Sequence, residues 1–199
     1  TKVNGDSIFP VLNMLNAKYV VMSEKEVVEN PAALGNAWLV NRVVYVDGAD
    51  AEMNALDSIH PAVTAVADLR FRDVLGTSVL PKAQGDTIYE TSYAPDRLTY
   101  RVKSGAGGLA VFSEVYFPWG WNVTIDGKEV TMGRVDYLLR AVRDPSGDHE
   151  IVMTYRPESV KVTGTLSLVS VIIIYVAVIA ALLFALISLP ARGKDKETA

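Results

Sequence analysis

The residues best suited to chemistry lie in one aromatic stretch, Phe112–Trp121 (FSEVYFPWGW). If the stretch begins as a β-strand, Phe112, Glu114 and Tyr116 share one face, because side chains alternate between the two faces of a strand. A carboxylate between aromatic rings can hold a sugar: the rings cover its apolar faces and the acid accepts hydrogen bonds from its hydroxyls. The plainer interpretation is a polar outer face on which Glu114 pairs with an arginine such as Arg140.

We therefore expect one substrate-binding cluster near the membrane-facing rim of the domain, for a carbohydrate or for the membrane part of a larger protein. Trp119 stands between a proline and a glycine, a turn position at which a large indole has no reason to join a core. Trp121 alternates with Val123 and Ile125 and is expected in the core instead. The residues assigned to the cluster are Glu114, Tyr116, Trp119 and Arg140.

The sequence predicts no catalytic residues, no metal site and no cofactor. The chain has no cysteine, and its two histidines, His60 and His149, stand far apart in turn-like positions. They lack the close spacing of metal-ligating pairs. The glycine-rich run Gly105–Gly108 precedes an expected strand rather than a helix, so it lacks the helix N-terminus on which phosphate loops depend. No nucleophile motif with a recognisable context is present.

Charge argues against nucleic acid as a partner. The formal net charge is −4, and outside the C-terminal tail lysines and arginines occur in no cluster larger than a pair. Nucleic-acid-binding domains instead gather basic residues on one face. The missing cysteines exclude disulfides but leave the compartment open.

Hydrophobic periodicity predicts a mostly antiparallel β-sandwich over residues 86–157. Apolar residues alternate with polar ones around Leu98, Tyr100 and Val102, as in a strand with one solvent-facing side. Asp126-Gly127 favours a tight hairpin. The strands expected after this one are Leu109–Phe117, Trp121–Ile125, Val135–Val142 and Glu150–Tyr155.

The first 85 residues predict a small α/β lobe, so that the whole chain is α+β. Asp50 is a candidate N-cap for the second helix, and residues 70–85 give no clear prediction. The elements expected are a helix at Phe9–Asn16, strands at Tyr19–Met22 and Ala37–Val46, a helix at Ala51–Ile59 and a strand at Ala62–Asp68.

A transmembrane helix is predicted from the uncharged run Leu166–Leu189. As a helix this run is roughly 36 Å long, enough to cross a hydrocarbon core of about 30 Å. Basic residues are slightly more numerous after it than before it, which favours a cytoplasmic C-terminus; a tail anchor with a cytoplasmic domain stays open. The expected divisions are a lobe (1–85), a sandwich (86–160), a membrane helix (163–190) and a basic cytoplasmic tail (191–199).

Several sequence blocks resemble the C-terminal end of the YfhO family of bacterial membrane proteins. Two positions depart from the family pattern: Asp136, where asparagine is usual, and Trp119, where a smaller or basic residue is more common. The blocks that carry the resemblance are Leu12–Tyr19, Gly35–Trp38, Ser113–Tyr116, Gly120-Trp121, Ile125–Gly127, Tyr137–Ala141 and Gly147–His149.

The resemblance implies that the chain is an excerpt of a polytopic protein similar to glycosyltransferases that use lipid-linked sugars at the cell envelope. The excerpt would be a non-catalytic extracytoplasmic C-terminal domain, residues 1–160, followed by the last helix in the bacterial cytoplasmic membrane. Its expected partners are membrane lipid, the remaining transmembrane part of the parent protein and carbohydrate. The alternative is a membrane-anchored binding or scaffold module for protein partners.

Overall fold

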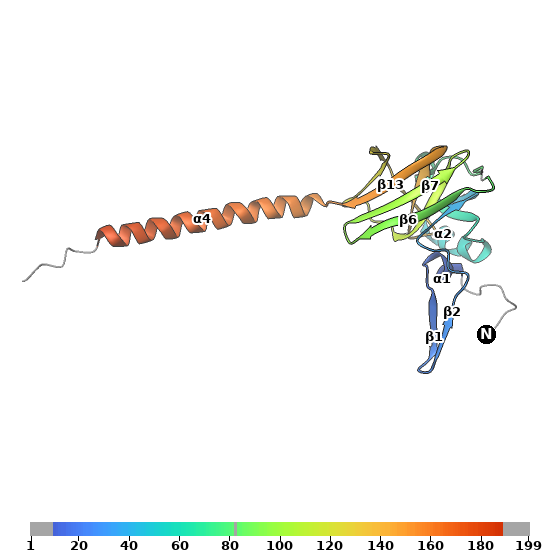
Figure 1. The fold of residues 1–199 in the computed structure, drawn as a ribbon, viewed down its shortest axis with the longest axis horizontal. Coiled ribbons are helices and arrows are strands. Elements are labelled where there is room, and N and C mark those ends of the chain that lie inside the picture. The colour runs from blue at the N-terminus through green and yellow to red at the C-terminus, as the bar shows by residue number, and fades with distance from the viewer. Residues whose placement is uncertain (1–9, 82, 189–199) are drawn as a thin grey trace, which may run out of the picture. The chain divides into compact units, whose positions relative to one another are not determined.

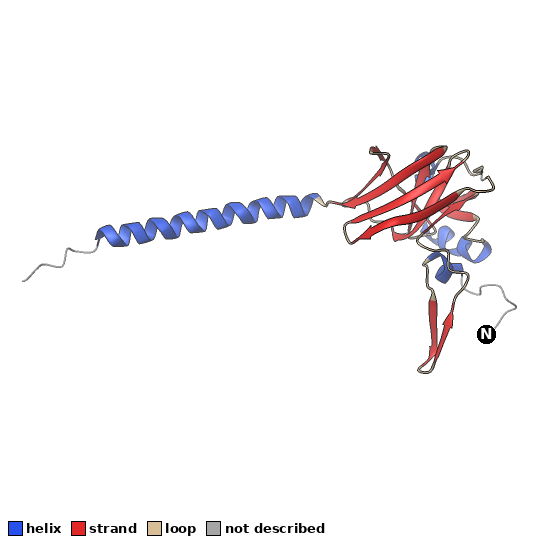
Figure 2. Cartoon of the chain, in the orientation of Figure 1, coloured by secondary structure: helices blue, strands red, loops and turns tan. Residues whose placement is uncertain are grey.

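A computed structural model describes residues 10–81 and 83–188. The fold is α+β, as expected: mostly antiparallel sheets, a small α/β region and a long apolar C-terminal helix (Figures 1 and 2). Contacts divide the chain into two units, Thr1–Arg156 and Pro157–Ala199. Residue 85, the expected end of a separate lobe, lies within the first unit, because a strand at Ala37–Val40 joins the sandwich.

One sheet of the sandwich has five strands, all paired antiparallel. Its central strands show the expected alternation: Leu98, Tyr100 and Val102 are buried on the inner face, while Arg101 and Lys103 are exposed. In spatial order the strands are β10 (Lys128–Val130), β9 (Trp121–Ile125), β13 (Gly147–Tyr155), β7 (Arg97–Ser104) and β6 (Thr87–Ala94).

The second sheet has four strands, also antiparallel. Its inner face packs on the five-stranded sheet, with Phe112 meeting Tyr100 edge to face at 4.7 Å between ring centroids. In spatial order its strands are β11 (Gly133–Val135), β12 (Leu139–Asp144), β8 (Gly108–Val115) and β3 (Ala37–Val40).

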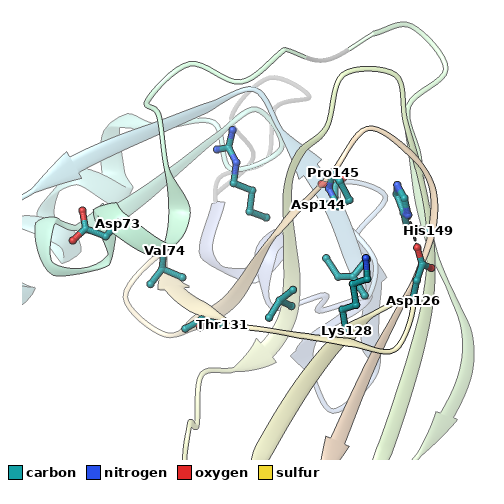
Figure 3. Close-up of a pocket in the computed structure, with 11 residues that line it drawn as sticks. Asp73, Val74, Asp126, Lys128, Thr131, Asp144, Pro145 and His149 are labelled. Atoms are coloured by element: carbon teal, nitrogen blue, oxygen red, sulfur yellow. Dashed lines mark hydrogen bonds and ion pairs between the residues drawn. The ribbon is translucent and has the colours of Figure 1, made fainter.

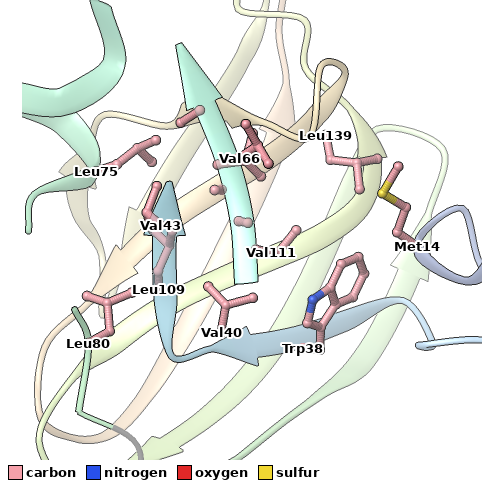
Figure 4. Packing of buried hydrophobic residues seen from close by; sticks show 14 of the residues in the cluster. Met14, Trp38, Val40, Val43, Val66, Leu75, Leu80, Leu109, Val111 and Leu139 are labelled. Carbon is pink, nitrogen blue, oxygen red and sulfur yellow. The ribbon is translucent and has the colours of Figure 1, made fainter. Parts of the chain in front are cut away.

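A further layer covers the outer face of the four-stranded sheet, and a second hydrophobic cluster fills the space between them (Figure 4). Val43 and Val66 from the parallel pair β4–β5 pack with Leu109, Val111 and the residues around them. The four-stranded sheet is therefore buried on both faces. The elements of this layer are β4 (Arg42–Val46), α2 (Ala49–Ala55), η1 (Leu56–Ser58), β5 (Thr64–Asp68), η2 (Leu69–Phe71) and α3 (Arg72–Leu75).

Three local predictions are wrong. The strand expected at Ala37–Val46 is two strands, β3 and β4, which break at Asn41 and join different sheets. The residues of the strand expected at Val135–Val142 belong instead to the β11–β12 hairpin. The sequence did not reveal its turn because both arms are buried and show no alternation of apolar and polar residues. Helix α2 is N-capped by Gly48 without a side-chain bond, so Asp50 is not the cap.

Near the N-terminus, helix α1 (Pro10–Met14) precedes a two-stranded hairpin. The predicted strand Tyr19–Met22 is confirmed as β1 (Tyr19–Ser23). Its partner β2 (Glu26–Glu29) lies in a segment for which the sequence predicted no element. Phe9, the first residue of the expected helix, lies outside the described residues.

The second unit contains helix α4 (Glu158–Ser188), whose 31 residues include almost all of the predicted membrane span. At about 1.5 Å per residue its length is roughly 46 Å, and it is long and apolar enough to cross a membrane. The end of the span at 189–190 and the basic tail at 191–199 lie outside the described residues.

Candidate functional site

Glu114 and Arg140 pair across neighbouring strands, as the plainer interpretation expected. Arg140 Nη2 lies 3.7 Å from Glu114 Oε2, and the Arg140 side chain is only 3% exposed. Its Nε donates to the Val115 carbonyl at 2.8 Å, and Nη1 lies 3.6 Å from Met153 Sδ. The guanidinium also stacks over the Trp121 ring, 4.2 Å from the centroid. Arg140 therefore ties the two sheets together from inside.

The electrostatics of this pair reflect its burial. Desolvation raises the pKa of Glu114, and the attraction of Arg140 offsets only part of that rise. Desolvation likewise lowers the pKa of Arg140. The buried Tyr100 hydroxyl, near both, has no hydrogen-bond partner in the described structure, and its pKa is raised well above its usual range. These are the features of an internal ion pair, in which favourable geometry offsets the free-energy cost of desolvating the two charges.

Trp121 has a mixed environment. It packs against the inter-sheet core, as predicted, but it is only half-buried. Its ring lies beneath Arg140 and is tilted on Tyr155, with the two ring centroids 5.3 Å apart. Its free side lines a small hollow of about 200 Å³ that also reaches Tyr116 and Pro118.

Tyr116 and Trp119 line a larger hollow of about 510 Å³, which we call the aromatic cleft. Trp119 is 73% exposed and meets Phe117 edge to face at 5.2 Å. Tyr116 meets Phe71 in the same way at 5.5 Å. The lining residues are Arg70, Phe71, Val115, Tyr116, Pro118, Trp119, Arg134, Tyr137 and Leu138.

The four predicted site residues thus fall into two pairs. Glu114 and Arg140 meet inside the sandwich, and Tyr116 and Trp119 meet at the aromatic cleft, to whose lining neither charged residue belongs. Among the aromatic and charged residues of the cleft, sequence reasoning missed Arg70, Phe71, Arg134 and Tyr137. Arg70 and Phe71 lie in a region that carried no periodic signal, so only the folded chain identifies them.

Arg134 is the fixed cation of the aromatic cleft. Its guanidinium carbon lies 5.7 Å from the centroid of the Phe71 ring and 5.5 Å from that of Tyr137. Arg134 Nη2 donates to Glu52 Oε2 at 2.6 Å, and Glu52 is fully buried. Glu52 Oε1 also accepts from the Tyr137 backbone N–H at 2.9 Å. Burial raises the pKa of Glu52, while Tyr137 and Arg134 oppose that rise.

Tyr137 enters the cleft from a strained turn. Asp136 and Tyr137 lie in the three-residue turn between the paired Val135 and Leu139, and both have positive φ, 51° and 69°. A tyrosine rarely adopts this conformation. Asp136 Oδ1 accepts from Val66 N at 2.8 Å, and Asp136 N donates to Val66 O at 2.7 Å. The buried Asp136 carboxyl, desolvated in this position, has its pKa raised to about 7.

A second hollow, the carboxylate cleft, measures about 730 Å³ (Figure 3). His149 Nδ1 lies 2.6 Å from Asp126 Oδ2, and Nε2 lies 2.9 Å from the Ser146 carbonyl. Because both ring nitrogens face acceptors, the pKa of His149 is raised. Asp144 is 3% exposed, and burial raises its pKa to about 6. The lining residues are Asp73, Val74, Ile125, Asp126, Lys128, Val130, Thr131, Arg143, Asp144, Pro145 and His149.

The two clefts offer different chemistry. The aromatic cleft presents apolar ring surfaces and arginine donors, whereas the carboxylate cleft presents charges of both signs. Within residues 10–81 and 83–188, no group of three histidine, aspartate or glutamate side chains is placed to hold a metal ion. The glycine-rich run is a turn, in which a Cβ at Gly107 would lie 2.9 Å from the Asp144 carbonyl oxygen.

The chain matches no protein-family model, no curated protein and no solved structure in the three comparisons made. The geometry of the two clefts and the character of α4 are therefore the basis for a functional proposal.

Proposed function

We propose that residues 1–156 form a carbohydrate-binding, non-catalytic domain whose binding site is the aromatic cleft. The observation that carries the proposal is the cleft itself, in which Trp119, Tyr116, Tyr137 and Phe71 surround a space of about 510 Å³. Aromatic rings cover the apolar faces of sugar rings, and the guanidinium donors of an arginine bond to sugar oxygens.

The rigidity of the cleft supports this assignment. The buried Glu52 fixes both the Arg134 side chain and the Tyr137 backbone. Asp136 secures the turn that carries Tyr137 by two bonds to Val66. A binding surface arranged before the ligand arrives loses less conformational entropy on binding. Glu114 and Arg140 have the different role of supporting the strands from which the cleft residues emerge.

The long apolar helix supports the cellular setting. We place α4 in the bacterial cytoplasmic membrane, residues 1–160 on the extracytoplasmic side and the C-terminus in the cytoplasm. On the resemblance to the YfhO family, the chain is the C-terminal part of a polytopic protein similar to lipid-linked-sugar glycosyltransferases, and the domain presents an acceptor to the membrane part. Reporter fusions at Ala199 test the orientation: a cytoplasmic reporter is expected to be active, and activity of a periplasmic reporter alone contradicts it.

Saccharide binding tests the site. The full chain in detergent micelles is titrated with cell-envelope oligosaccharides and followed by saturation-transfer NMR and calorimetry. Trp119→Ala is expected to weaken binding about fivefold, as loss of one stacking ring removes roughly 1 kcal/mol. Tyr89→Ala, which truncates an exposed ring on β6, is the matched control and leaves binding unchanged. Absence of binding to any oligosaccharide, or equal effects of the two variants, contradicts the proposal.

The scaffold alternative has an observation of its own. The β1–β2 hairpin exposes a group of large apolar side chains, which is unusual on a surface that meets only water. A protein-binding function predicts that changes in this hairpin abolish partner binding while saccharide binding stays intact.

A further inference from the structure

The β1–β2 hairpin carries apolar side chains that are exposed along almost its whole length. Within the described chain β1 pairs with β2 alone, and the hairpin extends away from the sheets (Figure 1). A lone two-stranded hairpin is only marginally stable in water, so a further strand would stabilise it. Its large exposed apolar side chains are Tyr19, Val21, Met22, Val27 and Val28.

The base of the hairpin is anchored, which leaves its outer part as the surface for a partner. Asn30 Nδ2 donates to Asn13 Oδ1 and to the Ala17 carbonyl, each at 2.9 Å. Met14, at the end of α1, is buried in the core beside the four-stranded sheet. The hairpin is therefore presented in a fixed position, with exposed residues on both strands.

The two edges of the hairpin differ in charge. Strand β2 begins and ends with glutamate, at Glu26 and Glu29. Charged side chains on an edge strand discourage pairing with another chain. Strand β1, Tyr19–Ser23, has no charged residue. The open edge is therefore that of β1.

The hydrogen-bond pattern shows which β1 residues offer their backbone outward. Asn30 N donates to the Lys18 carbonyl at 2.7 Å, and Tyr19 and Val21 stand opposite Glu29 and Val27. Bonded and non-bonded pairs alternate along an antiparallel ladder. The N–H and C=O groups of Tyr19 and Val21 consequently point away from β2, where a new strand can pair with them.

We propose that β1 pairs antiparallel with β1 of a second copy of this chain, about a two-fold axis at Val21. This register lets the two Val21 residues exchange both backbone hydrogen bonds. It also brings Lys18, exposed just before β1, near Glu24 of the second copy, exposed in the turn that follows a register shift between Val21 and Ser23, twice in the dimer. Opposite charges that lie close together across neighbouring strands stabilise such a pairing. The proposal does not depend on the carbohydrate function.

Disulfide trapping tests the register, and the chain has no native cysteine to interfere. In a Val21→Cys variant the two Cα atoms would lie ~5.5 Å apart, within disulfide range. In Val27→Cys, the matched control on the same face, they would lie roughly 14 Å apart, three strand spacings. For the full chain in detergent micelles under mild oxidation, Val21→Cys is expected to cross-link at least fivefold faster. Equal rates, or no cross-link at Val21→Cys, overturn the proposal.

Charge exchange tests the partner. Lys18→Glu is expected to raise the dimer dissociation constant about tenfold, and Lys18→Glu combined with Glu24→Lys is expected to restore it. Val21→Lys, which places two like charges at the axis, is expected to abolish the dimer. Light scattering of the full chain in micelles measures all three. A dimer that survives Val21→Lys, as a dimer held together by α4 alone would, overturns the proposal. A chain that remains monomeric overturns it as well. So does a hairpin that lipid vesicles shield without any dimer.

Discussion

The two sheets of the sandwich differ in how many of their faces are buried. The five-stranded sheet packs one face on the core and turns the other toward solvent, so exposed Arg101 and buried Tyr100 are neighbours in sequence. The four-stranded sheet lies between that sheet and the β4–β5 layer, and its strand β8 buries every residue from Gly108 to Phe112.

This difference decides where charged groups are energetically important. Ion pairs on the five-stranded sheet, such as Arg101–Asp148, are exposed to water and salt. Charged groups on the four-stranded sheet and its β11–β12 turn, such as Arg140 and Asp136, are almost completely buried. The aromatic cleft depends on this second set, because Asp136 fixes the turn that positions Tyr137.

Truncating a ring in each sheet should give the largest contrast. Phe112→Ala is expected to destabilise the domain by about 3–5 kcal/mol, because it leaves a cavity beside Tyr100. Tyr89→Ala, on the outer side of the five-stranded sheet, should change stability by less than about 0.5 kcal/mol. Urea unfolding followed by tryptophan fluorescence measures both. Similar losses for the two variants would show that the inner face is not the better packed one.

Removing one arginine from each sheet is the next test. Arg140→Ala should cost about 3 kcal/mol, because it leaves Glu114 half-buried without its counter-charge and removes the contact on Trp121. Arg140→Met, which keeps the volume, should cost clearly less. Arg101→Ala removes an exposed pair and should cost less than ~1 kcal/mol. The same unfolding measurement applies, and equal costs at Arg101 and Arg140 would refute the distinction.

Asp136 should give the two sheets opposite pH dependences. The pKa of Asp136 in the folded domain, about 7, lies above the ordinary value of 3.8. Its contribution to the free energy of unfolding therefore falls as pH rises between these two values. Asp136→Asn is expected to raise the free energy of unfolding by about 2 kcal/mol at pH 8. This is half of the ~4 kcal/mol that corresponds to the whole pKa difference, because the amide is itself desolvated. The gain should vanish near pH 4.

Asp148 on the five-stranded sheet supplies the control. Arg101 holds the pKa of Asp148 below its usual range, so the stability that this carboxylate contributes is present above its unfolded pKa and is lost as pH falls through the lower folded value. Asp148→Asn should therefore remove stability at neutral pH rather than add it. Unfolding midpoints from pH 4 to pH 8 compare the two variants, and a gain from Asp148→Asn would contradict the assignment.

The smallest effect is expected at Glu114. Its pKa is raised because desolvation outweighs Arg140 at 3.7 Å, so the charged form contributes little net stability. Glu114→Gln should change the free energy of unfolding by less than about 1 kcal/mol. It should also leave saccharide binding unchanged, whereas Trp119→Ala weakens it. A loss of binding with normal stability in Glu114→Gln would return this residue to the site.

The sequence by itself determined the features that depend on neighbouring residues. Alternation around Tyr100 predicted β7, which is confirmed because one side of that strand meets water. Asp126-Gly127 predicted a tight turn, and both residues have positive φ, 49° and 79°. The uncharged run after Lys161 predicted the long apolar helix α4, since length and apolarity are local properties.

Tertiary structure alone decided the features that depend on what covers each face. A strand buried on both sides has no alternation, so Val135–Val142 concealed a turn at Asp136. The aromatic cleft joins Phe71, Trp119 and Arg134 from segments far apart in the chain. No spacing in the sequence encodes that meeting, because it results from packing the β4–β5 layer against the four-stranded sheet. The pairing of Glu114 with Arg140 was predictable from strand parity, but its burial was not.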